Sequence, residues 1–367
     1  MSLDVVVVGA GIVGTATAWE LARRGAAVAL VDRAGISEGT TGLGEGDALC
    51  CDKDAGPELD LAVAGLALFD ELEALVGPAA RIRRKGALVV HPDARTWADE
   101  PARLDRLRAA GVEAEVVDDV LALEPQLTGP LHGATFFPRD LQCDPRAIAR
   151  ALAALAQEHG ATLRTHAEVE AVDGGVRLTG GEHLRARHVV LAAGPWSAPL
   201  TGLPVEPRKG QLTRLRLPSP DPSFLRRKVV DASYLLAVGA PDAGRQVATV
   251  VETTWDGHVV VGSTRERIGF DDRVDDDLAR EVQSLAARLV PGVAGLEPDD
   301  TWVGFRPWLP DGLPAIGALR DGVWAATGHE GAGVVLGPIT GRLLAQAICG
   351  ERPEVDLAPF DPGRFDR

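Results

Sequence analysis

Three glycines near the start of the chain have the spacing that lets a backbone bind a pyrophosphate. Gly9, Gly11 and Gly14 follow an apolar run and precede a stretch of helical periodicity. At such a turn the first glycine permits a tight bend, the second lets the backbone approach the phosphates, and the third lets the helix pack closely. N–H groups at the helix start, including those of Ile12 and Val13, then face the ligand together with the positive end of the helix dipole. The pattern predicts a dinucleotide site.

Asp32 is placed to bind the ribose of such a dinucleotide. It lies eighteen residues after Gly14, at the end of the second apolar run, and Arg33 follows it. A carboxylate at this point can accept hydrogen bonds from both ribose hydroxyls and disfavours a 2′-phosphate, so NADP is not expected. An ordinary acid in a strand-end turn is the alternative. We expect Asp32 and Arg33 to contact the cofactor.

A second glycine-rich helix start lies near the other end of the chain. Gly331, Ala332, Gly333 and Val334 belong to the segment GHEGAGVVLG. Bare N–H groups there can approach N1 and the C2 carbonyl of a flavin, where reduction leaves negative charge that a helix N-terminus stabilises. A glycine-rich helix start without a ligand is the alternative. Combined with the first glycine motif, the segment predicts an FAD held at both ends.

Arg306, in the segment GFRP, is the strongest candidate for binding substrate. A guanidinium can hold a carboxylate through two parallel charge-assisted hydrogen bonds and so fix the position of the α-carbon. The alternative is an arginine satisfied by backbone carbonyls beside Pro307. His329 precedes the second glycine loop and can serve either as a base or as a hydrogen-bonding residue that shapes the loop.

These residues require a frame that brings both ends of the chain together. Apolar runs at 3–8 and 26–31 flank a helix predicted over 12–24, which makes a βαβ unit. Asp144 and Pro145 form a good helix start. The further elements expected in this domain are helices over 57–76, 145–160 and 333–348 and strands over 161–169, 188–192 and 323–326.

The remaining segments lack this βα alternation and predict a second domain. Residues 87–138 mix short strands with a charged helix around 101–110, and residues 209–261 hold β-rich segments separated by turns, which predicts an antiparallel sheet. The predicted fold is α/β, with a Rossmann-type FAD-binding domain and an interleaved α+β substrate domain built on an antiparallel sheet. The expected ranges are 1–80, 138–206 and 302–367 for the first domain, and 81–137 and 207–301 for the second.

Composition narrows the classes of partner. A net charge of -15 over 367 residues argues against nucleic acid and anionic membranes as partners. Asp4 interrupts the first apolar run and no run of about twenty apolar residues follows, so we expect a cytoplasmic protein without membrane insertion. The four cysteines have no metal-binding spacing, so no metal is predicted; the role of adjacent Cys50 and Cys51 stays open.

Motifs along the whole chain resemble the superfamily of D-amino acid oxidase, glycine oxidase and sarcosine oxidase. They include the opening glycine motif, GTTGLGEG at 39–46, HVVLAAGPWS at 188–197, PRKGQL at 207–212, VVVGST at 259–264, and the segments around Arg306 and Gly331. The resemblance implies that several loop residues contact FAD. Those residues are Thr40 and Thr41 along the pyrophosphate and ribityl chain, Gly46 near the ring, Val169 at the adenine, and Gly194 and Trp196 beside the cofactor.

The resemblance also implies roles at the substrate. Arg306 would bind the substrate carboxylate, and Tyr234, the only tyrosine, would donate a second hydrogen bond from the sheet that covers the site. Three departures matter. The hairpin segment at 237–257 is longer than in that superfamily, and either reshapes the pocket or meets another subunit. No cysteine lies near Arg306, where sarcosine oxidases attach FAD, so noncovalent FAD is expected; and Gly331 stands where glycine oxidases carry a second arginine, which puts glycine in doubt as the substrate.

The expected reaction is oxidation of the C–N bond of a small amino acid or secondary amine, D-configured, glycine-like or proline-like. A hydride passes to flavin N5 and leaves an imine that water converts to a 2-oxo acid. Oxygen or another acceptor reoxidises the flavin. A 2-hydroxy acid dehydrogenase, an FAD subunit of a heteromeric dehydrogenase, and a non-enzymatic flavin carrier are the alternatives, so a partner subunit or a homo-oligomer stays open.

Overall fold

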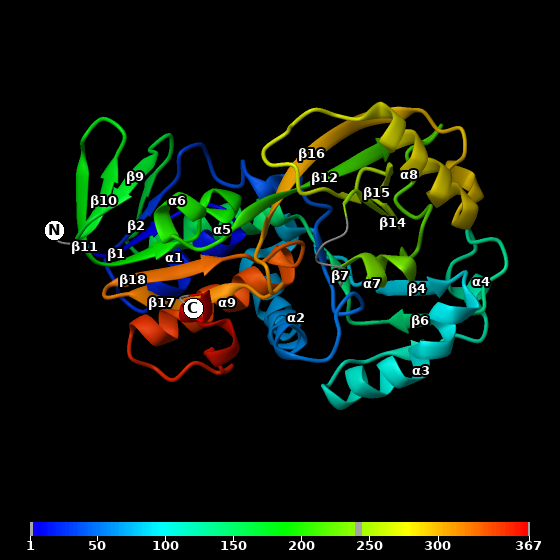
Figure 1. Ribbon diagram of the computed structural model, residues 1–367, viewed down its shortest axis with the longest axis horizontal. Helices are drawn as coiled ribbons and strands as arrows, with labels where there is room; N and C mark the ends of the chain where they lie inside the picture. Colours follow the sequence, from blue (N-terminus) through cyan, green and yellow to red (C-terminus); the bar gives the residue numbers. More distant parts are fainter. Residues whose placement is uncertain (1–2, 239–243, 366–367) are drawn as a thin grey trace.

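The computed structural model describes residues 3–238 and 244–365, arranged as two lobes that are each built on a sheet (Figure 1). The first sheet has the strand order β17-β18-β11-β1-β2-β8, with the hairpin β9–β10 attached to β11. The strands are β1 Leu3–Val8, β2 Val28–Val31, β8 Thr162–Arg164, β9 Val169–Val172, β10 Gly175–Leu178, β11 His183–Leu191, β17 Ala315–Arg320 and β18 Val323–Thr327. The five strands from β18 to β8 are parallel, as a Rossmann-type unit requires.

Helices cover this sheet and contribute to its core. Helix α1 (Ile12–Ala22) contacts α9 (Gly333–Ile348) and α5 (Pro145–Glu158), and α2 (Pro57–Val76) packs against α9. The first and last major helices of the chain are therefore neighbours, which brings the two glycine-rich segments into one lobe. Side chains of all four helices join β1 and β2 in the largest apolar cluster. No helix among the described residues is both long and apolar enough to cross a bilayer.

The second sheet has the strand order β16-β12-β15-β14-β13-β4-β6-β5. Its strands are β4 Ala87–His91, β5 Glu115–Val116, β6 Gly133–Phe137, β12 Glu206–Leu215, β13 Lys228–Asp231, β14 Gln246–Thr253, β15 Val259–Arg265 and β16 Pro298–Trp308. The predicted antiparallel sheet is present, with one exception, since β13 and β4 pair in parallel. The second lobe also contains helices α3 Ala94–Ala109, α4 Val120–Leu123, α7 Ser233–Val238 and α8 Asp276–Leu289.

Strands β12 and β16 are the longest strands of this sheet and pair from Glu206↔Trp308 to Leu215↔Pro298. In Figure 1 they extend from the first lobe into the second. Arg208 and Arg306 are directly opposite each other in this ladder. Smaller elements complete the junction: β3 Asp47–Ala48 pairs with β7 Leu141–Gln142, a 3-10 turn spans Thr40–Leu43 and another spans Gly194–Trp196, followed by α6 Ala198–Thr201.

The predicted fold class is confirmed, and several boundaries differ. Helix α3 begins at residue 94 rather than near 101, because the Asp93 side chain accepts a hydrogen bond from Arg95 N and caps the helix. Pro101 therefore lies inside this helix and not at its start. The strand expected over 161–169 is two short strands, β8 and β9. Residues 302–308 lie in β16 of the second sheet, whereas we expected the first domain to resume at 302. The domain ranges themselves stay a prediction.

Candidate functional site

A cavity of about 510 Å³ lies between the two sheets. Val8, Val31 and Thr327 line it from the carboxyl ends of β1, β2 and β18, and Gly210 and Gly304 line it from the second sheet. The carboxyl edge of a parallel sheet is the usual ligand site in such folds. Every predicted site residue except one lines this cavity: Gly9, Gly11, Ile12, Val13, Asp32, Arg33, Thr40, Thr41, Gly46, Val169, Gly194, Trp196, Tyr234, Arg306, His329, Gly331, Ala332, Gly333 and Val334.

The exception, Gly14, explains how the first glycine loop is kept tight. A Cβ on Gly14 would lie 1.8 Å from the Gly9 carbonyl oxygen, and a Cβ on Gly9 would lie 2.3 Å from the Ala192 oxygen. Gly9 also has a φ of 106°, which favours glycine. The loop therefore exposes bare backbone to the cavity, as a pyrophosphate requires, while Gly14 serves the packing of α1.

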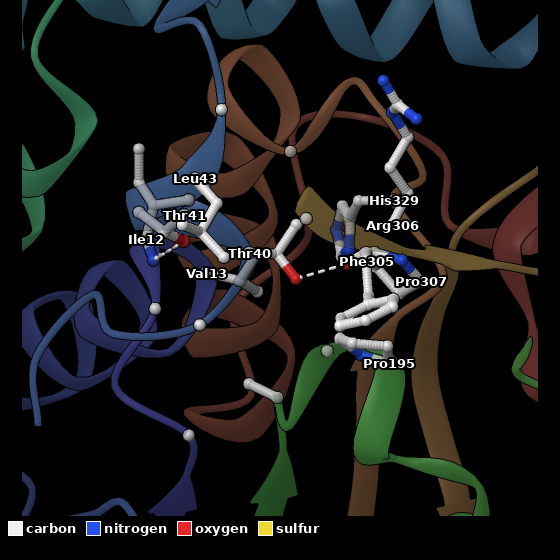
Figure 2. Close-up of a pocket in the computed structure, with 18 of the residues that line it drawn as sticks. Ile12, Val13, Thr40, Thr41, Leu43, Pro195, Phe305, Arg306, Pro307 and His329 are labelled. Atoms are coloured by element: carbon white, nitrogen blue, oxygen red, sulfur yellow. Dashed lines mark hydrogen bonds between the residues drawn. The ribbon is translucent and has the colours of Figure 1, made fainter. Parts of the chain in front are cut away.

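The start of α1 is bound by a loop residue rather than left open. Ile12 N donates to Thr41 Oγ1 at 3.0 Å, as Figure 2 shows. We expected this N–H to face the phosphates directly. The neighbouring Thr40 hydroxyl donates to the Phe305 carbonyl oxygen at 2.6 Å. The turn Thr40–Leu43 thus joins the glycine loop of the first lobe to β16 of the second.

Asp32 is held rigidly at the end of β2. One carboxylate oxygen accepts from Ala10 N and the other from Ala34 N, both at 2.7 Å. The carboxylate therefore has a fixed orientation while it lines the cavity. Next to it, the Arg33 guanidinium lies 3.8 Å from the ring centroid of Trp196, a cation–π contact that forms one wall of the site.

The second glycine segment begins α9 without a side-chain cap. Gly333 is the first helical residue, and Ala332 supplies no side-chain hydrogen bond at the helix start. Open N–H groups and the positive helix end therefore border the cavity beside Gly331. This is the environment that a flavin gaining negative charge on reduction would need.

Arg306 lies within β16. Its NH1 donates to the Thr264 carbonyl oxygen at 3.0 Å. The guanidinium lies over Gly210, where a Cβ would come within 2.1 Å of NH1. The absence of a side chain at Gly210 thus makes room for the Arg306 guanidinium, which is largely buried at the cavity wall.

Tyr234 lies on α7 rather than in the sheet, because Ser233 N donates to the Asp231 carboxylate and the chain turns into a short helix. The Tyr234 hydroxyl accepts from Arg265 NH2 at 2.8 Å. Burial raises the pKa of Tyr234, so the phenol keeps its proton. Since the hydroxyl accepts from Arg265, that proton is available to a ligand in the cavity.

His329 is buried and bound within the protein. Its Nε2 lies 3.0 Å from Thr340 Oγ1. Burial lowers the pKa of His329 to about 4, so the imidazole is neutral near pH 7. This arrangement favours the loop-shaping alternative over a catalytic base.

The sequence patterns missed Glu330 and Arg265. The Glu330 Oε1 atom lies 3.5 Å from Arg208 NH1, 3.6 Å from Arg265 Nε and 4.0 Å from Arg306 Nε. Burial opposes ionisation of Glu330, but Arg265, Arg306 and Arg208 outweigh it and hold the pKa of this carboxyl below its usual value. The available signal was an acid inside a glycine-rich loop; its partners come from separate strands.

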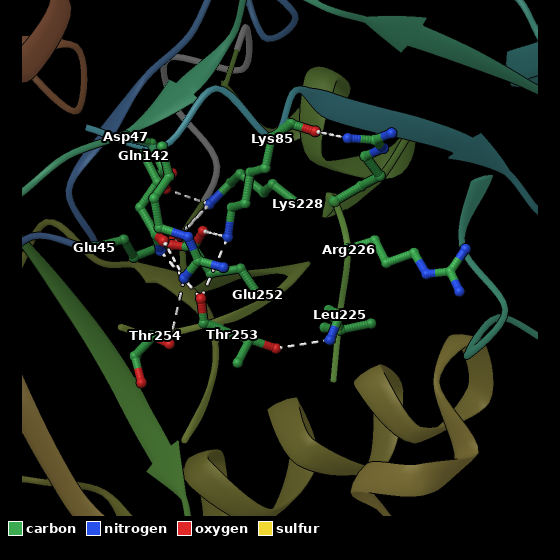
Figure 3. A network of polar contacts seen from close by, with 12 residues as sticks. Glu45, Asp47, Lys85, Gln142, Leu225, Arg226, Lys228, Glu252, Thr253 and Thr254 are labelled. Atoms are coloured by element: carbon green, nitrogen blue, oxygen red, sulfur yellow. Dashed lines mark hydrogen bonds and ion pairs between the residues drawn. The ribbon is translucent and has the colours of Figure 1, made fainter. Parts of the chain in front are cut away.

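A second buried ionic network borders the cavity (Figure 3). Lys228 Nζ contacts the Glu45 carboxylate and lies 2.6 Å from Asp47 Oδ2, and Lys85 Nζ lies 2.7 Å from Glu252 Oε2. Burial, reinforced by the Glu252 carboxylate, raises the pKa of Asp47. Three carboxylates of this network have the spacing of a metal site, but they surround the Lys228 ammonium.

The cysteines are not part of the cavity lining. Cys50, Cys51 and Cys143 are buried free thiols, Cys349 is an exposed one, and none of the four lines the cavity. Burial raises the pKa of both Cys50 and Cys51, which disfavours the reactive thiolate. Adjacent thiols in this setting are packing residues of the core.

Comparison with known proteins gives a consistent result. A family model described as FAD dependent oxidoreductase matches residues 4–347. The chain is similar to glycine oxidase of Pseudomonas aeruginosa, with 32% identity over 99% of each protein. It is similar to the crystal structure of glycine oxidase from Geobacillus kaustophilus, with a TM-score of 0.87 and 29% identity over 99% of both chains. It is also similar to iminodiacetate oxidase from Chelativorans sp. BNC1, with a TM-score of 0.82 and 29% identity over 98% of this chain and 99% of the other.

The cavity supports the same assignment independently. Bare backbone at Gly9 and Gly11, a fixed carboxylate at Asp32 and an uncapped helix start at Gly333 are the features that pyrophosphate, ribose and flavin ring require. The family match extends over nearly the whole chain. The chain therefore belongs to the FAD dependent oxidoreductase family, in the superfamily of the D-amino acid and glycine oxidases, and is an enzyme that uses FAD.

Proposed function

We propose that this enzyme oxidises the C–N bond of a small amino acid whose carboxylate is bound by Arg306. The observation that carries the proposal is the Arg306 guanidinium at the cavity wall, fixed by the Thr264 carbonyl and close to the start of α9. The similarity to a glycine oxidase and to an iminodiacetate oxidase supports an amine as the oxidised group.

The protein's contribution to this reaction is mainly positional. Arg306 holds the carboxylate in a fork, and Tyr234 donates a hydrogen bond from the opposite element, α7. Two anchors on one carboxylate fix the direction of the α-C–H bond, which converts an encounter into an oriented complex. FAD, when bound, supplies the hydride acceptor. Loss of the α-hydrogen from a neutral amine leaves an imino acid, which water hydrolyses.

The first-lobe residues would hold the cofactor without a covalent bond. Asp32 would bind the ribose, Gly9 and Gly11 would border the pyrophosphate, and Gly331 to Val334 would border the flavin ring. The absence of cysteine from the cavity lining supports noncovalent attachment. Acid precipitation of the purified protein should leave the yellow flavin in the supernatant; flavin that remains in the pellet would contradict this part.

A matched substrate panel tests the proposed reaction. Amino acids in both configurations, N-alkyl glycines and proline are compared with the 2-hydroxy acids of the same side chains, and loss of flavin absorbance is followed without oxygen. We expect bleaching by amino acids and none by hydroxy acids. The reverse result would assign the 2-hydroxy acid chemistry, and bleaching by neither would indicate a non-enzymatic flavin carrier. Admission of air then shows whether oxygen reoxidises the flavin or a different acceptor or partner subunit is required.

A further inference from the structure

Three arginines converge on one carboxylate beside the Arg306 site. They come from adjacent strands of the second sheet: Arg306 from β16, Arg208 from β12 and Arg265 from β15. All three approach the same oxygen atom of Glu330, at 4.0, 3.5 and 3.6 Å respectively. The other Glu330 oxygen accepts from Gly331 N.

This cluster carries an excess of positive charge among the described residues. Three guanidinium groups share one carboxylate, which gives these four side chains a formal net charge of +2. Two other acids of the cavity lining are already paired, Asp52 with Lys53 at 2.7 Å and Glu45 with Lys228. Burial and repulsion from Arg265 lower the pKa of Arg306. Burial also opposes the charge of Arg265, but Tyr234 and Glu330 outweigh it and raise the pKa of that side chain.

Arg265 is the least satisfied member of the cluster. It is fully buried, and its NH2 donates to the Tyr234 hydroxyl. Its Nε and NH1 have no hydrogen-bond partner. Buried, unpaired N–H groups on a charged side chain are expensive, so each needs a physical explanation. Neither Arg265 nor Arg208 lines the cavity, so their charges act on a ligand there through space rather than by contact. Arg265 lies directly behind Tyr234 and Glu330, which both line the cavity.

We propose that the substrate carries two carboxylates, one bound by Arg306 and Tyr234 and the other lying in the field of Arg265 and Arg208. This inference rests on the proposed amino acid oxidation and names its substrate class: an amino dicarboxylate or an N-carboxyalkyl amino acid. The two negative charges of such a substrate balance the formal net charge of the cluster. Gly331 adds room, since the cavity wall beside Arg306 carries no side chain there.

The wild-type holoenzyme tests the proposal with pairs that differ only in the second charge. Aspartate is compared with asparagine, glutamate with glutamine, and N-(carboxymethyl)glycine with N-(carbamoylmethyl)glycine, using both enantiomers where they exist. We expect a kcat/KM at least tenfold higher for the dicarboxylate in the pair that reacts fastest. Neutral members that react equally well in every pair would overturn the proposal and leave the proposed function intact. No reaction with any amino acid would overturn both.

Substitutions of Arg265 test whether this side chain causes the preference for dicarboxylates. Arg265→Gln should lower the ratio of kcat/KM between each dicarboxylate and its neutral partner tenfold or more, and Arg265→Lys should restore part of that ratio. The ratio is the readout because loss of the hydrogen bond to Tyr234 lowers kcat/KM for both members of a pair. Arg273→Gln removes an exposed guanidinium on the same lobe and should leave the preference unchanged. An unaltered preference in a folded, yellow Arg265→Gln protein would contradict the inference. If that variant does not fold, inhibition of the wild type decides: glutarate must compete at least tenfold more tightly than butyrate.

Discussion

The Arg306 side chain is positioned before any substrate binds. Its NH1 donates to the Thr264 carbonyl oxygen, and the group lies flat over Gly210. A preorganised guanidinium loses little entropy when it takes a carboxylate, and its planar fork sets the orientation of the bound group. We therefore expect the contact between Arg306 and the substrate carboxylate to stabilise the oriented complex that reacts.

Replacement of Arg306 should accordingly reduce catalysis without removing the cofactor. Arg306→Ala should lower kcat/KM by roughly 100-fold, about 3 kcal/mol, which is the loss typical of a buried charge-assisted pair. Arg306→Lys keeps the positive charge but not the planar fork, and its kcat/KM should lie between those of the alanine variant and the wild type. Steady-state kinetics and the flavin-to-protein ratio measure both effects. An alanine variant with unchanged kcat/KM would refute the carboxylate anchor.

His329 gives a prediction about pH and stability. Its pKa is lowered to about 4 in the folded protein, below its unfolded value of about 6.5. The unfolded state therefore binds the proton first on acidification, and the stability associated with this residue is lost as the pH falls from about 6.5 to about 4. His329→Gln should remove up to roughly 3 kcal/mol of that pH dependence. Melting temperatures of both proteins across this range provide the measurement; identical pH profiles would contradict the buried neutral imidazole.

Some residues of the site could be predicted from the sequence, and others could not. The glycines and Asp32 were found because backbone approach and ribose binding demand particular residue types at fixed spacing along one βαβ unit. Arg265 and Glu330 were not found, since their contact depends on strands far apart in the chain. Nothing in the local pattern around Arg265 distinguishes it from an exposed strand residue.

At the level of elements, the contact between α1 and α9 sets the relative position of the two glycine-rich segments. Gly341 is a point of close approach: a Cβ there would lie 2.6 Å from Ala16 C and from Thr17 N. These are backbone atoms, which cannot move aside without shifting a helix.

The exchange Gly341→Ala should therefore destabilise the protein by about 1–3 kcal/mol through overpacking, despite the higher helix propensity of alanine. It should also weaken FAD retention, because both cofactor loops adjoin these helices. Ser284→Ala on the exposed face of α8 is the matched control and should change stability by less than about 0.5 kcal/mol. Unfolding in denaturant gives both values. A Gly341→Ala protein as stable as the control would show that the helices are not in contact as described.

Elements with strong periodicity were predictable, and elements set by local caps were not. Helix α2 runs over the predicted residues because its apolar spacing is long and regular. Helix α3 begins earlier than predicted because a single capping side chain, Asp93, decides its start. Helix α7, which carries Tyr234, interrupts a β-rich stretch whose composition favours strands.

For the whole molecule, the cavity joins segments from both ends of the chain and from both lobes. Its lining extends from Val8 to Val335 and includes the second-sheet residues Leu212 and Phe305. A ligand that fills this space contacts both sheets, so binding must stabilise the folded arrangement as a unit. The sequence predicted that two lobes would enclose one site, but not the order of strands that assembles the arginine cluster.

Removal of FAD should lower the melting temperature, and added FAD should raise it with increasing concentration. Saturation to about 100 times Kd corresponds to roughly 2.7 kcal/mol of stabilisation. Asp32→Asn keeps one acceptor oxygen but removes the charge and one acceptor, and should weaken FAD binding at least tenfold. Thermal melts of apoprotein at graded FAD concentrations test both statements. A melting temperature that does not respond to FAD would argue against the cavity as its site.

We propose that a substrate carboxylate is bound at Arg306 before the neighbouring amine is oxidised. The most direct measurement is anaerobic bleaching of the flavin by the best amino acid of the panel and by the amide of the same compound, which lacks the carboxylate charge. We expect rapid bleaching by the free acid and a rate at least 100-fold slower with the amide, because the amide cannot form the charge-assisted pair with Arg306. Equal bleaching by the two compounds would contradict it.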